Sequence, residues 1–488
     1  MNAPIIYWYR QDLRTHDLPG LIAAAATGHP VIPCYILDDQ APGEWSPGGA
    51  SRWWLHHSLA ALGRDIAGAG GTLVLRSGNT GAELQKLIQE TGAAEVYCSR
   101  HYEPWAAALE KQLHDDLDAA GVTLKRYGGN LLFEPEQISN QSGLPFKVFT
   151  PFWKHCLKMP EPAAPRPVPE SITWLQGVLH SVPLDDLGLR PRQPDWAAAW
   201  TDQWQPGSQG AAKKLQSFLH NGIENYSEGR NHPALDCTTR LSPHLHYGEI
   251  SPRQLWHSAR QTAATRPRLD TQVAKFLSEM GWREFSHHLL HHFPELDAQP
   301  FKERFAHFPW MSNDQGLQAW QQGQTGYPLV DAGMRELWHT GYMHNRVRMI
   351  VASFLTKHLL IHWRVGAKWF WDTLLDANLA NNSCGWQWVA GSGADASPYF
   401  RIFNPILQGQ KFDAQGEYIR HWVPELAAMP DRYLNNPWDA PAAILDSAGV
   451  HLGSTYPLPI VDHTPVSYTH LTLPTTLCMC RSRWSADH

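Results

Sequence analysis

The sequence predicts an N-terminal α/β domain built on a doubly wound parallel sheet, followed by a larger all-α domain. At 488 residues the chain is too long for one ordinary domain. Short apolar runs alternate with helical patterns over residues 1–128. Beyond residue 210, apolar residues recur at intervals of three and four, which is typical of helices that bury one face.

The first domain is expected to contain five strands, because five apolar, β-rich runs are separated by helical patterns such as residues 51–67 and 104–119. The runs span residues 5–9, 31–37, 72–75, 95–98 and 122–127. The loop after the first run reads RQDLRTHD and lacks the glycines of a dinucleotide-binding turn. The carboxyl edge of this sheet could hold a small chromophore, and a purely structural domain is an equal alternative.

Residues 129–209 are predicted to be a long connection, because periodicity fades there and prolines gather, as in PEPAAPRPVPE at 160–170. An all-α domain is expected over residues 210–463, with helical patterns at 211–221, 252–265, 269–292, 330–341, 344–362 and 367–375. Residues 466–488 show neither helical nor strand periodicity and are predicted to be a non-native or disordered tail.

Composition narrows the class of protein. With 23 tryptophans and 18% charged residues, the chain favours aromatic-lined pockets over disorder. The net charge of −6 means that nucleic acid would need a local basic face. Residues 341–371 offer one, since Arg and Lys occur there without Asp or Glu, although a solvated helix face is the commoner meaning of such a run.

The seven cysteines lack the spacing of a metal site, so reduced thiols and no structural metal are expected. The N-terminus has charges where a secretory signal would be apolar, and no run is long enough to span a membrane. These features favour a cytoplasmic protein.

Three short patterns could carry chemistry. Glu279, Trp282 and Arg283 fall within one helical turn and could face one cavity, although a surface ion pair beside a core tryptophan is the more frequent meaning. Asn345 and Met349 are four residues apart and share a helix face. The run TTRLSP could present hydroxyls to a pyrophosphate, or could simply cap a helix.

Three longer blocks carry a resemblance. They are TGYPLVDAGMREL from Thr325, NRVRMIVASFLTKHLLIHWR from Asn345, and GWQWVAGSGADASPYFRIFNP ending at Pro405. With the N-terminal WYRQDLR, they occur in the order that is typical of the photolyase/cryptochrome flavoproteins. The chain resembles this family to about Pro459, and most closely the bacterial cyclobutane pyrimidine dimer photolyases.

The resemblance implies FAD as cofactor. The matching flavin contacts are Tyr226, Thr238, Thr239, Arg240, Leu241, Ser242, Arg283, Asn345, Arg348, Asp376, Ala377, Asn378 and Asn382. Asn382 would face flavin N5, where plant-type cryptochromes carry a carboxyl group, and Arg348 would pair with Asp376. One departure is Asn378, which stands where the family usually has a second Asp, so the effect on flavin potential and affinity stays open.

The resemblance also implies an electron-hopping chain from Trp386 through Trp363 to Trp310, whereas three unrelated tryptophans would more often be packing. Glu279 would bond the pyrimidine carbonyls, and Trp282 and Trp388 would clamp an extruded dinucleotide, a step known for photolyases in general. The (6-4) enzymes have histidines where this chain has Asn345 and Met349, so cyclobutane dimers are the expected substrate. The expected DNA contacts are Arg230, Glu279, Trp282, Asn345, Arg346, Trp388, Arg401 and Gln408.

The implied function is light-dependent repair of UV-damaged DNA by a carbon–carbon lyase, a monomer that needs no protein partner. One alternative is a cryptochrome-type blue-light photoreceptor; another is a nonenzymatic helical scaffold whose tryptophans are only core. A second chromophore stays open between methenyltetrahydrofolate, a deazaflavin, a second flavin and none. Trp105 and Ala106 stand where one folate-binding subgroup has Asn and Glu.

Overall fold

The computed structural model describes residues 3–398 and 401–466. Within this part, the chain forms two compact units, and both are discontinuous in sequence. The first unit holds the residues up to Ser227, Cys237–Glu295 and Trp371–Asn381; the second holds Glu228–Asp236, Leu296–Phe370 and the residues from Asn382 onward. The domain limits read from the sequence stay a prediction. The predicted tail lies outside the described residues except for Val466.

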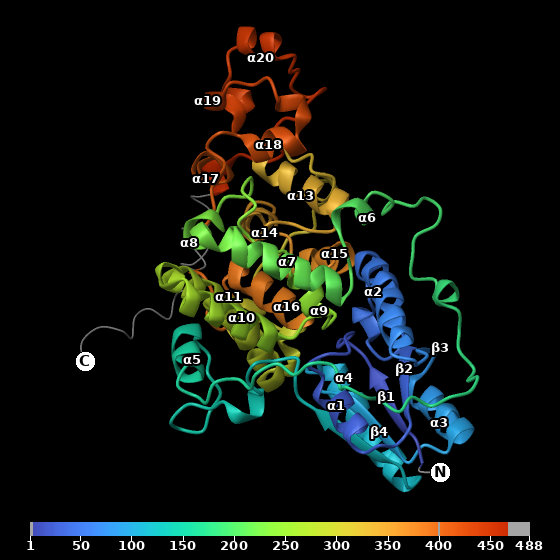
Figure 1. Ribbon diagram of the computed structural model, residues 1–488. Helices are drawn as coiled ribbons and strands as arrows, with labels where there is room; N and C mark the ends of the chain where they lie inside the picture. The colour runs from blue at the N-terminus through green and yellow to red at the C-terminus, as the bar shows by residue number, and fades with distance from the viewer. Residues whose placement is uncertain (1–2, 399–400, 467–488) are drawn as a thin grey trace. The chain divides into compact units, whose positions relative to one another are not determined.

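The first unit begins with a five-stranded parallel sheet in the order β3-β2-β1-β4-β5 (Figure 1). Its strands are β1 Ile5–Tyr9, β2 Val31–Leu37, β3 Val74–Ser77, β4 Glu95–Ser99 and β5 Thr123–Tyr127. The helices between them are α1 Pro19–Ala26, α2 Gly49–Gly68, α3 Thr80–Thr91 and α4 Pro104–Ala119. This sheet and the helical remainder confirm the predicted fold class. The central strands are apolar throughout because helices bury both faces of a parallel sheet.

Seven helices complete the first unit or begin within it. They are α5 Phe149–Cys156, α6 Trp200–Gln203, α7 Ser208–His220, α8 Tyr226–Gly229, α9 Ser242–His246, α10 Pro252–Thr265 and α11 Asp270–His292. Short 3-10 turns connect several of them.

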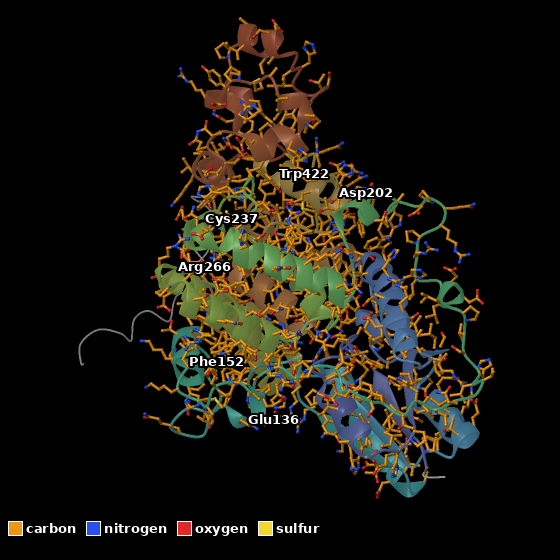
Figure 2. The ribbon with its side chains drawn as sticks, viewed as in Figure 1. Glu136, Phe152, Asp202, Cys237, Arg266 and Trp422 are labelled. Atoms are coloured by element: carbon orange, nitrogen blue, oxygen red, sulfur yellow. The ribbon has the colours of Figure 1, made fainter. Side chains whose placement is uncertain are left out.

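Helix α5 lies inside the segment that the sequence predicts to be a connection, and it packs on α11. Phe152, labelled in Figure 2, lies 5.1 Å from Phe285 between ring centroids. A Cβ at Gly281 would come within 2.6 Å of the Trp153 ring, so glycine lets the two helices approach closely. The packing fixes α5 beside the middle of α11.

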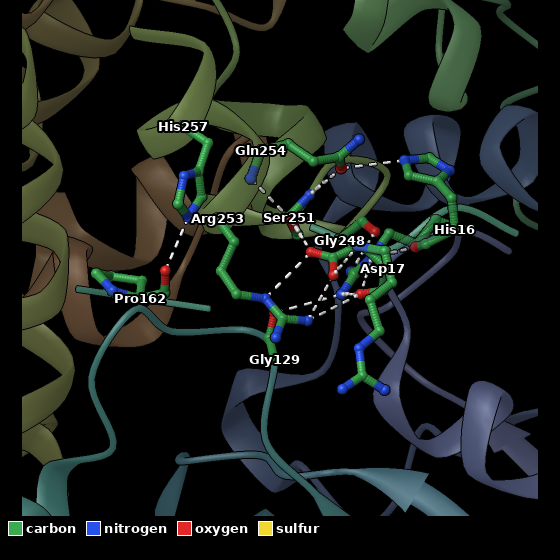
Figure 3. Close-up of polar contacts among 11 residues, drawn as sticks. His16, Asp17, Gly129, Pro162, Gly248, Ser251, Arg253, Gln254 and His257 are labelled. Atoms are coloured by element: carbon green, nitrogen blue, oxygen red, sulfur yellow. Dashed lines mark hydrogen bonds and ion pairs between the residues drawn. The ribbon is translucent and has the colours of Figure 1, made fainter. Parts of the chain in front are cut away.

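A buried polar network holds α10 against the loop that follows β1 (Figure 3). The carboxylate of Asp17 is fully buried and forms an ion pair of 2.7 Å with Arg253 and a hydrogen bond with Ser251. Ser251 also caps α10 in a capping box with Gln254. The helices that follow the linker are thereby anchored to the α/β part of the same unit.

The turn Trp371–Asn381 returns to the first unit and closes on the start of α2. The backbone N–H of Gly49 donates to Asp372 Oδ1 at 2.8 Å, and Trp371 Nε1 donates to the carbonyl of Ser46 at 2.8 Å. A Cβ at Gly48 would lie 2.3 Å from the Cα of Asp372, so only glycine fits there.

The second unit is helical. Its elements are α12 Asp314–Gln321, α13 Pro328–Thr340, α14 Asn345–Ser353, α15 Trp363–Thr373 up to Phe370, α16 Leu379–Ala390 from Asn382, α17 Pro405–Phe412, α18 Glu417–Trp422, α19 Asp431–Leu434 and α20 Ala442–Ala448. The single helix predicted over residues 344–362 is wrong at its C-terminal part. Helix α14 ends at Ser353, a π-helical turn follows over Phe354–His358, and Leu360 has a φ of 54°. The apolar spacing continues through this turn, which is why the sequence does not reveal the break.

Candidate functional site

Helix α11 presents the predicted lesion-contacting side chains on one stretch. Glu279 is partly exposed, and its carboxylate forms an ion pair of 2.8 Å with Lys275, one turn earlier. The pair lies at the i,i+4 spacing that brings two side chains together on a helix surface. Lys275 therefore helps to fix the position of the Glu279 carboxylate.

Trp282 is stacked on an aromatic side chain from α5. The ring centroids of Trp282 and Phe149 lie 3.8 Å apart with an interplanar angle of 9°. Both side chains are half-buried. One face of the indole is thus covered, and the stack restricts the orientation of Trp282.

Arg283 points into the interior of the first unit. It forms an ion pair of 3.1 Å with Glu284, whose other oxygen accepts hydrogen bonds from the backbone N–H groups of Leu132 and Phe133. Burial raises the pKa of Glu284 to about 7 and lowers the pKa of Arg283. The linker is in this way bonded to the helix that carries the predicted site residues.

The segment predicted to contact the flavin phosphates includes a residue with unusual backbone geometry. Arg240 has a φ of 48°, in the left-handed region that non-glycine residues rarely adopt. Beside it the N–H of Leu241 donates to Thr239 Oγ1 at 3.1 Å. Thr238 and Thr239 are half-buried, while Arg240 and Ser242 are exposed. The two exposed side chains are accessible to a ligand.

Tyr226 is buried instead, and its ring packs on Phe218 and Phe276.

The turn before α16 carries Asp376, Ala377 and Asn378. Asp376 is half-buried, and its charge raises the pKa of His246 against the stronger opposing effect of burial. Ala377 and Asn378 are buried. Asn378 precedes α16 and caps it, because its Oδ1 accepts the N–H of Asn381 at 3.0 Å.

In the second unit, the first turn of α14 carries four predicted site residues. Asn345 is exposed, whereas Arg346, Arg348 and Met349 are half-buried. Arg346 donates to Asn231 Oδ1 at 2.6 Å and lies 4.5 Å from the Phe412 ring centroid. Arg348 donates to the carbonyl of Met343 at 2.7 Å. These contacts restrain both guanidinium groups near the start of the helix.

The three predicted electron-transfer tryptophans lie at different depths of the second unit. Trp386 and Trp363 are buried, at 2% and 1% exposure, whereas Trp310 is half-buried. Gly366, one turn after Trp363 on α15, receives the Trp386 ring, since a Cβ there would lie 2.0 Å from it. The buried pair is thus gathered at one face of α15.

A histidine joins the outer two tryptophans. The ring of His362 lies 5.1 Å from that of Trp310 and 5.5 Å from that of Trp363, between centroids. Burial lowers the pKa of His362. The order from Trp386 to Trp310 therefore leads from the interior toward the surface.

Asn382 and Trp386 show how a flavin would fit the second unit. Asn382 Nδ2 donates to the carbonyl of Ala367 at 2.9 Å, which leaves its Oδ1 as the atom that a ligand donor can reach. Trp386 Nε1 is buried and has no hydrogen-bond partner among the described residues. An unpaired buried donor of this kind is costly unless a ligand satisfies it. An acceptor at Asn382 and a donor at Trp386 fit a flavin, which carries both N–H groups and acceptor atoms.

The remaining predicted DNA contacts belong to the second unit. Trp388 and Arg230 are half-buried, and Arg401 is exposed. Gln408 lies on α17, and its Oε1 is buried without a hydrogen-bond partner in the described part of the chain.

The predicted site residues fall in both units. The Arg348–Asp376 ion pair and the Trp282–Trp388 clamp each join one residue of each unit, and they stay predictions. Sequence reasoning missed Phe149, His287 and His362. The run SHHLLHH on α11 is unusual, but nothing in it marks His287 as the neighbour of a site residue.

Residues 3–398 and 401–466 hold no group of three or more His, Cys, Asp or Glu side chains arranged for a metal ion. No helix in this part of the chain has the length and apolar character needed to cross a membrane.

Two protein families match the chain. Residues 5–170 match the DNA photolyase family, and residues 276–472 match the FAD binding domain of DNA photolyase. The chain is 50% identical to the deoxyribodipyrimidine photo-lyase of Agrobacterium fabrum, over 95% of both chains. It is 39% identical to cryptochrome-1 of Arabidopsis thaliana, over 93% of this chain and 68% of the relative.

Solved structures agree with these relatives. The crystal structure of a bacterial class III photolyase from Agrobacterium tumefaciens superposes with a TM-score of 0.94 at 49% identity, over 98% of each chain. An archaeal photolyase from Sulfolobus tokodaii, solved with two FAD molecules, superposes with a TM-score of 0.79 at 26% identity, over 97% of this chain and all of the other (100%).

Proposed function

The chain belongs to the photolyase/cryptochrome family, and on that basis we propose that it is a deoxyribodipyrimidine photo-lyase that repairs UV-damaged DNA in light. The observation that carries the proposal is 50% identity to a protein of that name over 95% of both chains. FAD is the cofactor, and when bound in its reduced form it supplies the photoexcited electron that splits the cyclobutane ring.

The side chains of α11 would hold the lesion. The Glu279 carboxylate that pairs with Lys275 only accepts hydrogen bonds, so a bond to the pyrimidine carbonyls would be donated by the protonated carboxyl group after the ion pair is released. Trp282 offers an apolar ring held by its stack with Phe149, which suits a base that has left the duplex. In the second unit, Trp388 would offer a further indole on which a base can stack.

Asn345 and Met349 favour cyclobutane dimers as the substrate. Neither side chain can donate a proton as an imidazole does, and splitting a cyclobutane ring needs no such donor. Arg230, Arg346, Arg401 and Gln408 would contact the DNA strand, and guanidinium–phosphate pairs bind without sequence preference.

The flavin would be held by Tyr226, Arg283 and the residues around Arg240 and Asn378 in the first unit, and by Asn345, Arg348 and Asn382 in the second. The Asn382 amide, fixed by Ala367, offers an oxygen to an N–H donor such as N5 of a reduced flavin. Trp386, Trp363 and Trp310 would return the flavin to its reduced form by passing electrons inward.

The experiment is a repair assay. Purified protein with reduced flavin should restore thymine monomers in oligonucleotides that contain cyclobutane dimers, under light and not in darkness. A Glu279→Gln variant should repair more slowly, and a Glu303→Gln variant, which changes an exposed carboxylate elsewhere, should not. Persistence of dimers under light, with the flavin reduced, would rule the proposal out.

A cryptochrome-type photoreceptor is the second candidate, and the 39% identity to cryptochrome-1 favours it. A photoreceptor would not need lesion contacts, which this chain retains at Glu279, Asn345, Met349 and Trp388. Preference for damaged over undamaged DNA in darkness distinguishes the two.

We further propose a monomer that acts in the cytoplasm without a protein partner. A second, light-harvesting chromophore can accompany FAD, and its identity stays open; absorption and fluorescence spectra of the purified protein would identify it. Sedimentation velocity tests the monomeric state.

A further inference from the structure

Asn378 is the one predicted flavin contact at which the chain departs from its family, and the structure pairs it with a histidine. The amide Nδ2 of Asn378 lies 3.4 Å from Nε2 of His287 on α11. Both side chains are buried, at 6% and 4% exposure. Their contact is internal to the first unit.

The hydrogen bonds of His287 determine which partner it accepts. Its Nδ1 lies 2.9 Å from the backbone carbonyl of Arg283, and a carbonyl can only accept. The Nδ1 atom therefore carries the proton. In the neutral ring Nε2 is then a bare acceptor, and it requires a donor at position 378.

An amide provides that donor, and a carboxylate does not. With Asn378, the NH₂ group donates to His287 while Oδ1 accepts the N–H of Asn381. The two contacts fix the amide orientation from both ends. An aspartate would cap α16 equally well but would set an oxygen lone pair against the lone pair of Nε2.

The surroundings keep the imidazole uncharged. Burial and, to a smaller extent, the positive charge of Arg283 together lower the pKa of His287 to about 3. The other groups close to the ring are His246 on α9, His101 after β4 and Tyr102, whose ring lies 6.0 Å away. None of these offers the negative charge that would favour an imidazolium.

We propose that His287 and Asn378 form one uncharged, hydrogen-bonded pair beside the flavin, where the family usually has a charged aspartate. His287 is the positioning residue, because it orients the Asn378 amide. This inference rests on the proposed function, because it places Asn378 at the flavin ring. Without a carboxylate at this point, the site is less negative, and the anionic reduced flavin is favoured over the oxidised form. The pair thus explains how the chain accommodates asparagine at position 378.

The test combines flavin midpoint potentials with ¹⁵N NMR of histidine-labelled, flavin-free protein. In the wild type, His287 should stay neutral with its proton on Nδ1 down to about pH 5. Asn378→Asp should let His287 take up a proton at higher pH. At a pH at which His287 is still neutral, the added carboxylate should also lower the ratio of reduced to oxidised flavin by roughly tenfold at a fixed solution potential.

Asn381→Asp is the matched control, because it adds the same charge three residues away at an exposed position. It should change the flavin ratio by less than about twofold. An equal effect of the two substitutions would overturn the proposal, as would a wild-type His287 that carries its proton on Nε2.

A double-mutant cycle tests the same pair if Asn378→Asp folds poorly. His287→Gln retains a neutral acceptor and should leave the potential unchanged, whereas His287→Arg should weaken flavin binding. The double variant His287→Arg/Asn378→Asp should restore that binding through an ion pair. Independent, additive effects would contradict the pairing.

Repair is measured separately, so the two proposals can fail separately. If the protein repairs dimers but the His287 and Asn378 substitutions have additive effects on flavin binding, only the proposed pairing is refuted. Protein that shows the coupled potentials but leaves dimers intact refutes the repair function alone.

Discussion

Trp282 lies face to face with Phe149, with ring centroids 3.8 Å apart and planes inclined by 9°. The two residues come from α11 and from α5, inside a segment whose sequence indicates only a connection. A helix in the linker thus supplies the support for a side chain that we place against the lesion.

Phe149→Leu should weaken the binding of dimer-containing DNA in darkness. Loss of an aromatic stack costs roughly 0.5–1.5 kcal/mol, which corresponds to a loss of about 2- to 12-fold in affinity. Fluorescence anisotropy with damaged oligonucleotides measures it. Phe146→Leu is the control, because that ring packs on Phe152, His155 and His288. Equal losses in both variants would show that the stack does not matter.

Gly366→Ala should slow flavin photoreduction and destabilise the protein by about 1–3 kcal/mol. The added Cβ would lie 2.0 Å from the Trp386 ring, so the indole must move. Gly385→Ala on α16 is the matched control, since its Cβ would meet no atom within 4 Å. It should be neutral or stabilising, because alanine favours helix. Absorbance under illumination with an external reductant gives the rate, and unchanged photoreduction in Gly366→Ala would contradict the predicted role of Trp386.

Arg346→Gln should weaken binding to damaged and undamaged DNA alike and reduce the salt slope of binding by about 1. Asn231 and Phe412 hold the guanidinium group of Arg346 in place, so its contact with a phosphate would require little ordering. Binding at several salt concentrations checks this. A loss restricted to damaged DNA would instead assign Arg346 to the lesion.

Lys357→Met should stabilise the protein by on the order of 2 kcal/mol at pH 7. Burial lowers the pKa of Lys357 to about 7, so the folded state disfavours the charged form. The penalty is complete below pH 7 and falls as the pH rises toward the ordinary lysine pKa, where the unfolded chain also loses its proton. Thermal unfolding should therefore show a larger gain at pH 7 than at pH 10. Lys368→Met, at an exposed position of α15, should show no such difference.

Much of the fold follows from the sequence, and the failures have physical causes. The central strands were predictable because parallel strands covered on both faces are continuous apolar runs, as in β1 and β2. The strand predicted over residues 72–75 lies instead at Val74–Ser77, where Arg76 is buried through its ion pairs with Glu83 and Glu90. Helix α5 is only eight residues long and sits among prolines, so its periodicity is too short to stand out.

The sequence predicted only those site residues that match a motif of a known family. The roles predicted for Glu279, Trp282 and Asn382 come from the resemblance of the chain to a known family. His287 and Phe149 contact site residues that are far away in the sequence; His287 and Asn378, for example, are 91 positions apart. Hydrophobic periodicity describes only local structure and does not reveal such contacts. Such neighbours emerge from packing, which a single sequence does not encode at short range.

The bond between Gly49 and Asp372 joins residues 323 positions apart within one unit. A ribosome releases the N-terminal sheet long before it releases this partner. The amide of Gly49 and the carbonyl of Ser46 therefore stay bonded to water until about three quarters of the polypeptide has been synthesised. Fragments that stop ahead of Trp371 would lack this closure, so the start of α2 would keep these two groups in contact with water.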